Sequence, residues 1–139
     1  MIIEIIYFLR TFGLTASREQ VINIYDYLHK MMQSGRLITF RNNDKLIGFC
    51  TYSMCDQFEP LYEKKIWEYS DHDEDGKAAY IEMIVCEKWN KKLREMVEKT
   101  IASKYPNYEY GVWHRPTQDD DKIVIAKRRD YVSSKHSNQ

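Results

Sequence analysis

The sequence predicts a single α+β domain in which helices flank a mostly antiparallel sheet. The chain has 139 residues, of which 43% are hydrophobic, which is enough for one core and one domain. Segments with helical periodicity alternate with short segments rich in β-branched and aromatic residues, in the order helix, two strands, strand, helix, two strands. We expect the domain to cover residues 1–129 and residues 130–139 to form a flexible polar tail.

The amino-terminal part predicts one clear helix. Residues 2–12 are apolar and fit either a first strand or a short helix ending at Gly13. Residues 17–34 predict a helix that begins with a capping box, Ser17 with Gln20, because each side chain can bond a free backbone N–H of the first turn. The side chains predicted to form its buried stripe are Val21, Ile24, Tyr25, Leu28, Met31 and Met32.

The middle of the chain predicts a hairpin followed by an insertion. Residues 37–42 and 45–54 have strand composition and flank Asn43-Asp44, a pair that tolerates the backbone of tight turns. Residues 57–69 fit a helix or a long irregular insertion, and the acidic run 71–76 predicts a solvated loop.

The carboxy-terminal half predicts a strand, a helix and two more strands. Residues 78–86 have strand composition, and residues 90–104 predict a helix capped by Asn90. Residues 108–114 and 122–127 predict the last two strands, joined through an acidic turn at 119–121. The helix residues predicted to face the sheet are Leu93, Val97 and Ile101.

Composition excludes several classes of protein. Lysine plus arginine and aspartate plus glutamate both number 21, so the net charge is 21 − 21 = 0, and neither nucleic acid nor a membrane surface is an expected partner. No apolar run approaches the roughly 20 residues of a membrane span, and the amino terminus lacks the basic start of a signal peptide. Three cysteines without a CxxC motif fit a reduced protein, so we expect a cytoplasmic location.

Two stretches resemble the GNAT family of acetyl-CoA-dependent N-acyltransferases. KLIGFCTYS looks like the third strand of that family, and AAYIEMIVCEKWNKKLREMVEKTI looks like its fourth strand and following helix. The resemblance implies an acyl-CoA cofactor such as acetyl-CoA, whose pantetheine arm binds strand backbone and whose pyrophosphate binds the amino terminus of the helix. The cofactor-binding residues that it implies are Ile84, Val85, Lys88, Asn90, Lys91 and Lys92.

The turn between that strand and helix departs from the family. The Arg/Gln-x-x-Gly-x-Gly/Ala signature is absent, because no glycine stands between Cys86 and Lys92. Glycines there let the backbone approach phosphate oxygens, so the lysines either supply the positive charge instead or form an ordinary solvated helix face.

The same resemblance suggests catalytic residues. It places Glu82 on the fourth strand as the general base, with the alternative that Glu82 faces solvent. Tyr110 or Tyr131 would protonate the departing thiolate. The acceptor of the acyl group, a small molecule or a protein, is not indicated by the sequence.

A calcium site is an alternative for the acidic segment. Residues 71–82 fit the EF-hand formula D-x-D-x-D-G-x5-E, which supplies oxygen ligands to Ca²⁺. Against it, the chain has no second loop of this kind, and the exit segment has strand composition where an EF-hand needs a helix. The ligands in this alternative are Asp71, Asp73, Asp75 and Glu82.

A non-catalytic interaction protein is the third possibility. Acidic clusters at 71–75 and 119–121 and basic clusters at 88–94 and 127–129 suit a protein partner or self-association. A GNAT-like virion component of a phage would have these features.

Overall fold

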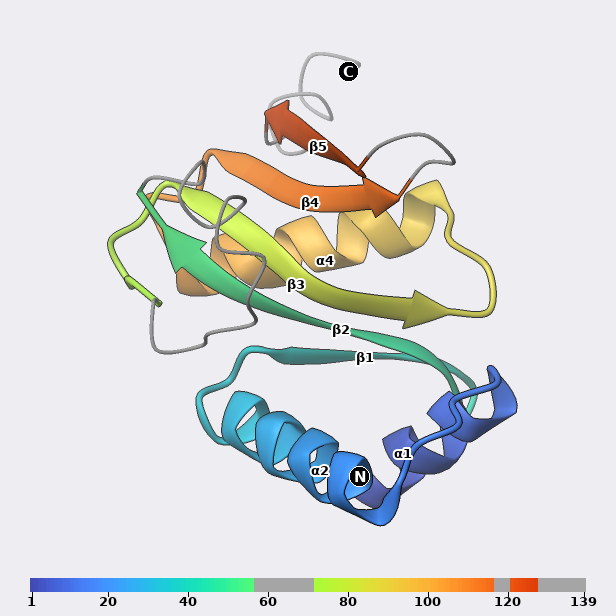
Figure 1. Cartoon of the computed structure of the whole chain (residues 1–139). Coiled ribbons are helices and arrows are strands. Elements are labelled where there is room, and N and C mark those ends of the chain that lie inside the picture. Colours follow the sequence, from blue (N-terminus) through green and yellow to red (C-terminus); the bar gives the residue numbers. More distant parts are fainter. Residues whose placement is uncertain (57–71, 117–120, 128–139) are drawn as a thin grey trace.

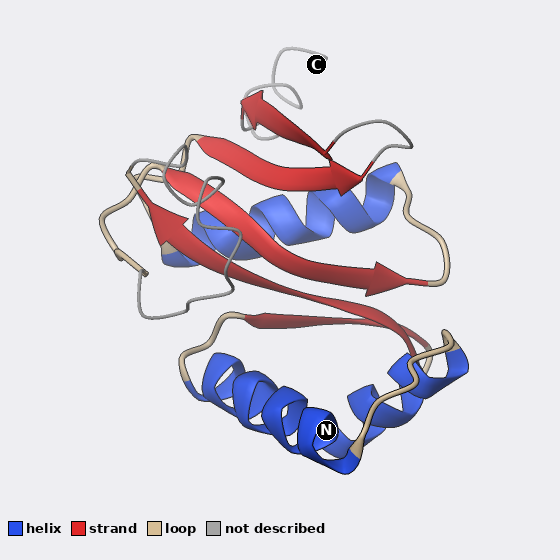
Figure 2. Ribbon diagram, viewed as in Figure 1, coloured by secondary structure: helices blue, strands red, loops and turns tan. Residues whose placement is uncertain are grey.

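The chain forms an α+β fold, in which a five-stranded sheet carries helices on both faces (Figure 1). This computed structural model describes residues 1–56, 72–116 and 121–127. The predicted fold class is confirmed, and Figure 2 shows the sheet between α4 on one side and α1 and α2 on the other. The elements are α1 (Ile2–Thr11), α2 (Arg18–Gln33), β1 (Leu37–Asn42), β2 (Lys45–Cys55), β3 (Ala78–Cys86), α4 (Lys91–Lys104), β4 (Tyr110–Pro116) and β5 (Asp121–Lys127).

The sheet is mostly antiparallel, as the sequence predicts. Its strands follow chain order, and β1–β2, β2–β3 and β4–β5 are antiparallel pairs. Only β3 and β4 run parallel, because α4 carries the chain back between them. The predicted hairpin turn is present, with Asn43 in the left-handed region at φ 55°.

Two apolar cores lie on opposite faces of the sheet. Helices α1 and α2 cover one face over β1 and β2, where Ile5, Leu28 and Phe49 are fully buried. Helix α4 covers the other face, where Ile101 packs against Tyr52 and other residues of β2. Each face therefore has its own set of helices, while Cys55, Ala78 and Tyr80 belong to a smaller cluster with Val112 of β4.

Local signals in the sequence place most element ends correctly. The Ser17–Gln20 capping box forms in both directions, and the Asn90 side chain accepts a hydrogen bond from the Leu93 N–H. Gly35, at φ 72°, follows the end of α2.

Three sequence expectations change or become definite. The segment 2–12 forms a helix over Ile2–Thr11, because its apolar residues recur at helical spacing and pack against α2 and β2. The strand expected at 108 begins at Tyr110, since Tyr108 closes a turn onto the Tyr105 carbonyl. Tyr25 and Met32, expected in the buried stripe, are exposed.

Some expectations fall outside the described residues. These are the insertion at 57–69, residues 119 and 120 of the acidic turn, and the tail at 130–139. Within the described part of the chain, no helix combines the length and the apolar character needed to cross a membrane.

Candidate functional site

Glu82 stands at an irregularity in the central strands. Thr51 pairs with Met83 and Tyr52 pairs with Ile81, so Glu82 is the extra residue of a bulge in β3. A bulge breaks the alternation of side chains between the two faces and redirects the inserted one. Glu82 is only 2% exposed, and its carboxylate contacts Tyr27 of α2. The alternative in which this residue faces solvent is therefore wrong.

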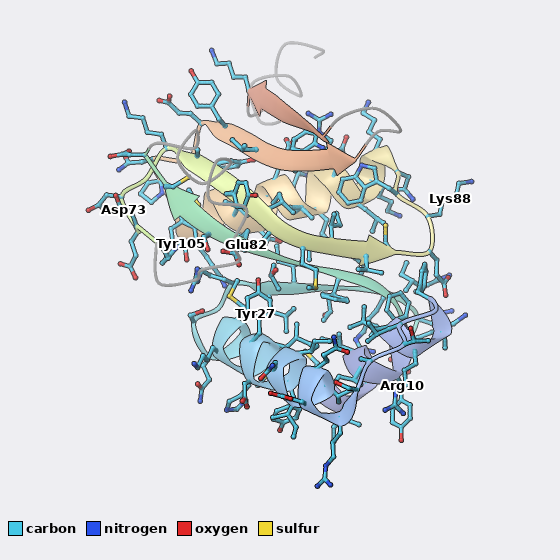
Figure 3. The ribbon with its side chains drawn as sticks, in the orientation of Figure 1. Arg10, Tyr27, Asp73, Glu82, Lys88 and Tyr105 are labelled. Atoms are coloured by element: carbon cyan, nitrogen blue, oxygen red, sulfur yellow. The ribbon has the colours of Figure 1, made fainter. Side chains whose placement is uncertain are left out.

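The Glu82 carboxylate is held by hydroxyl groups. The Tyr27 hydroxyl donates to Oε2 at 2.5 Å, and the Ser53 hydroxyl donates to Oε1 at 2.6 Å. Figure 3 shows Tyr27 reaching from α2 toward Glu82 beneath the sheet. Both carboxylate oxygens thus have partners, as a buried charge requires.

The surrounding groups extend these contacts into a network. The Arg36 guanidinium donates to Ser53 Oγ at 2.7 Å and is itself buried. The Tyr27 and Thr51 hydroxyls lie 2.9 Å apart. Burial raises the pKa of Tyr27 far above its usual range, and the negative charge of Glu82 adds to that shift, so Tyr27 keeps its proton and remains a donor. We call this set of residues the Glu82 network: Tyr27, Arg36, Thr51, Ser53 and Glu82.

A cavity opens where β3 and β4 stop pairing. Their parallel ladder runs only from Ala78–Tyr110 to Ile81–Trp113, although β3 continues to Cys86. A cavity of about 430 Å³ lies beyond this point, between the two strands and α4. Such a volume is in the range of small-molecule sites, and the lining is mostly apolar. The lining residues are Phe12, Cys50, Ile81, Ile84, Val85, Cys86, Trp89, Arg94, Val97, Glu98, Ile101, Tyr108, Gly111, Trp113 and Ala126.

The cofactor residues expected from the sequence are split by the structure. Ile84 and Val85 line the cavity, together with Trp89 of the following turn. Lys88, Asn90, Lys91 and Lys92 are exposed and do not line it. Figure 3 shows Lys88 pointing outward at one end of the molecule. The Asn90 side chain caps α4, which is a structural role.

The expected catalytic residues are likewise only partly brought together. Glu82 follows Ile81, a cavity residue, in the chain, but its carboxylate lies on the opposite, α2 side of the sheet. Tyr110 pairs with Ala78 at the start of β3 and is not among the residues that line the cavity. Tyr131 lies outside the described residues.

The acidic loop gives calcium no assembled site among the described residues. No group of three or more potential metal ligands occurs in residues 1–56, 72–116 and 121–127, and Asp71 is not described. Asp73 accepts hydrogen bonds from the Asp75 and Gly76 backbone N–H groups. Both carboxylate oxygens of Glu82 already accept hydrogen bonds, from Tyr27 and Ser53. The exit segment is strand β3. Calcium binding stays a prediction for this segment.

His72 anchors the same loop to β2. Its Nδ1 accepts a hydrogen bond from the Met54 N–H at 3.0 Å, and its Nε2 lies 3.4 Å from the Tyr105 hydroxyl. Partial burial lowers the pKa of His72, and the positive charge of Arg36 lowers it further, against Glu74 and Asp73. The folded protein therefore favours the neutral ring, whose Nδ1 is free to accept.

We predict that His72 makes the fold less stable in mild acid. The pKa of His72 in the folded protein lies below the ordinary 6.5. Its contribution to the free energy of unfolding is therefore complete above pH 6.5 and is lost as the pH falls toward the folded pKa. His72→Asn, which keeps an acceptor for Met54, should reduce the acid-dependent fall in Tm by about a few degrees. Thermal unfolding across this pH range tests it, with His29→Asn as the matched control. An unchanged pH dependence in His72→Asn would contradict the assignment.

Several site residues escaped sequence reasoning. Tyr27, Thr51 and Ser53 look like surface residues of a helix and a strand, and only their tertiary neighbours make them partners of Glu82. A weak signal existed in β2, where Thr51 and Ser53 alternate with the apolar Tyr52 and Met54 on a strand buried on both faces. Arg94 and Glu98 have ion-pair spacing on a helix, but spacing does not reveal burial.

No protein-family model matches the chain, and no curated protein matches it in sequence. The geometry of the Glu82 network and of the cavity is what supports a function.

Proposed function

We propose that this protein is an acyl-CoA-dependent N-acyltransferase. In this proposal the cavity between β3, β4 and α4 holds the acyl-pantetheine arm, and Glu82 receives the proton released by the acceptor amine. The observation that carries it is the end of the β3–β4 ladder at Ile81–Trp113, directly before Glu82. An apolar cavity and a buried carboxylate thus meet at one point of the sheet from its two faces.

The cavity walls suit a pantetheine arm. Its lining is mostly apolar, and the residues of β3 after Ile81 pair with β2 but have no ladder with β4. Backbone N–H and C=O groups on that edge of β3 can therefore pair with the amides of an extended ligand, as in strand addition. Ile84 and Val85 are the residues that provide this edge and also line the cavity.

The pyrophosphate would be bound by side chains. No glycine stands between Cys86 and Lys92. The Asn90 side chain already accepts a hydrogen bond from the Leu93 N–H, so that N–H is not available to a phosphate. The exposed Lys88, Lys91 and Lys92 near the start of α4 supply the positive charge in this proposal. Because exposed charges are screened by salt, affinity for acyl-CoA should fall as ionic strength rises.

Glu82 is suited to take a proton. Acyl-CoA supplies an activated thioester, whose carbonyl carbon forms a bond to the acceptor nitrogen while the carbon–sulfur bond breaks. CoA leaves as a thiolate, which takes a proton from solvent. The nitrogen gives up a proton, and in this proposal that proton crosses the open end of the β3–β4 ladder to the carboxylate held by Tyr27 and Ser53 on the α2 face. Arg36, next to Ser53, balances the charge of the carboxylate before transfer.

We predict that Ile84→Lys weakens acetyl-CoA binding at least about tenfold. Ile84 is 40% exposed and lines the cavity, so a lysine can be accommodated at the surface while its charge faces the apolar wall. Titration with acetyl-CoA followed by tryptophan fluorescence measures the effect, because Trp89 and Trp113 line the same cavity.

The control is the same substitution on the far face of the sheet. Ile22 of α2 is 51% exposed and does not line the cavity, so Ile22→Lys should bind acetyl-CoA as the parent does. Equal affinities in all three proteins, or no saturable change in the parent at millimolar acetyl-CoA, would count against the proposed function.

A non-catalytic binding protein is the second candidate. The observation in its favour is a hollow of about 340 Å³ between α1 and α2, where Ile3, Tyr7 and Ile22 are exposed. Exposed apolar patches of this kind often mark interaction sites. A parent protein that ignores acetyl-CoA but elutes as a stable oligomer, and becomes monomeric on Ile22→Lys, would favour this candidate.

A further inference from the structure

Helix α4 places an acidic side chain in the wall of the cavity. Glu98 is only 7% exposed and lies among Val97 and Ile101, which pack against the sheet. Its Oε1 accepts a hydrogen bond from the Arg94 Nε at 2.9 Å. Its Oε2 is buried and has no hydrogen-bond partner in the part of the chain that the structure describes.

An unpaired carboxylate oxygen in this position lowers the stability of the ligand-free protein. A buried acceptor without a donor loses its hydration and gains nothing in return. A leucine at position 98 would fill similar space without that cost. None of the residues that the structure describes donates to Glu98 Oε2, so a donor that enters the cavity would complete its hydrogen bonds.

The charge balance of the wall indicates what kind of donor fits. Arg94 lies beside Glu98 and already pairs with it, so the two side chains together carry no net charge. A cationic ligand would add an uncompensated positive charge to a mostly apolar cavity, which is unfavourable. A neutral amide N–H or hydroxyl satisfies Oε2 without bringing a charge.

We propose that Glu98 is a ligand-binding residue, whose Oε2 accepts a hydrogen bond from a neutral N–H or O–H group of the molecule bound in the cavity. The identity of that molecule rests on the proposed function, in which the donor is an amide or hydroxyl group of the pantetheine arm. Arg94 is the positioning residue, because its bond to Oε1 leaves Oε2 as the oxygen available to the ligand.

The test uses pantetheine and acetyl-CoA as probes and measures both affinity and stability. In Glu98→Leu the affinity for each probe should fall about tenfold, because the ligand donor loses its acceptor. The Tm without ligand should stay level or rise, since the unpaired oxygen is gone. Glu98→Gln should also lose affinity, because a glutamine has only one acceptor oxygen. Its NH₂ group would then face a donor, either that of Arg94 or that of the ligand. Glu95→Leu, on the same helix but outside the cavity lining, is the matched control.

The outcomes separate this inference from the proposed function. Lower affinity in both Glu98 variants, together with an undiminished Tm in Glu98→Leu, supports the role. If the parent binds the probes and both variants bind them equally well, Glu98 is not a ligand-binding residue, while the proposed function stands. If the parent binds neither probe, the proposed function fails and the inference fails with it.

Discussion

Glu82→Gln is expected to lower the rate of acyl transfer by a factor of about 10²–10⁴, the usual contribution of a general base. The amide cannot accept a proton, so the acceptor nitrogen loses its base. The readout is release of free CoA thiol with the best acceptor from a panel of amines. Binding of acetyl-CoA should stay within about twofold of the parent, because Glu82 does not line the cavity.

The fold should tolerate this substitution. The glutamine oxygen can accept from Ser53, and its amide can donate to the Tyr27 oxygen, whose proton then turns to Thr51. These hydrogen bonds can be kept, but the charge that balances Arg36 is lost, so the Tm is measured beside the rate to separate a catalytic effect from unfolding. Glu109→Gln, at an exposed glutamate before β4, is the matched control and should keep full activity. An undiminished rate in Glu82→Gln would remove the proposed role.

Gly48→Ala is expected to destabilise the protein by about 3 kcal/mol, at the upper end of overpacking effects. A Cβ at position 48 would lie 2.5 Å from the Cys86 Cβ and 2.7 Å from the Val85 carbonyl oxygen. These atoms belong to the neighbouring central strand, where backbone cannot yield without breaking the β2–β3 ladder. Thermal or urea unfolding measures the loss.

Gly111→Ala provides the contrast. Its Cβ would meet nothing closer than 3.6 Å, and the position needs no left-handed backbone, so its stability should remain near that of the parent. Cys86 and Val85 line the cavity, so Gly48→Ala should also weaken acetyl-CoA binding. A Tm of Gly48→Ala equal to that of Gly111→Ala would contradict the close approach of β2 and β3.

The sequence is most informative where structure depends on neighbours in the chain. Ser17 with Gln20, and Asn90 with Leu93, satisfy backbone groups within one turn, so both helix starts could be predicted. The hairpin at Asn43 is local in the same way. The nature of residues 2–12 was left open, because their apolar pattern becomes decisive only through contacts with α2 and β2.

The candidate site depends on contacts between distant segments, which explains what was missed. The bulge places the side chains of both Glu82 and Met83 on the α2 side of the sheet. A prediction that assumes side chains alternate between the two faces along β3 would place one of them on the wrong face. Ile84 and Val85, which line the cavity, are expected as cofactor residues only through a family resemblance, while the place of Glu98 depends on how α4 packs over the sheet. No periodicity in one helix reveals which of its acidic residues will face a cavity.

We propose that the end of the β3–β4 ladder binds an acyl-CoA arm. The most direct measurement is a map of backbone amide and indole N–H chemical shifts during titration with acetyl-CoA. The proposal predicts the largest changes at Met83–Cys86 and at the Trp89 and Trp113 indoles, with Ile3 and Ile22 unchanged. Shifts confined to the α1–α2 hollow, or none at millimolar acetyl-CoA, would contradict it.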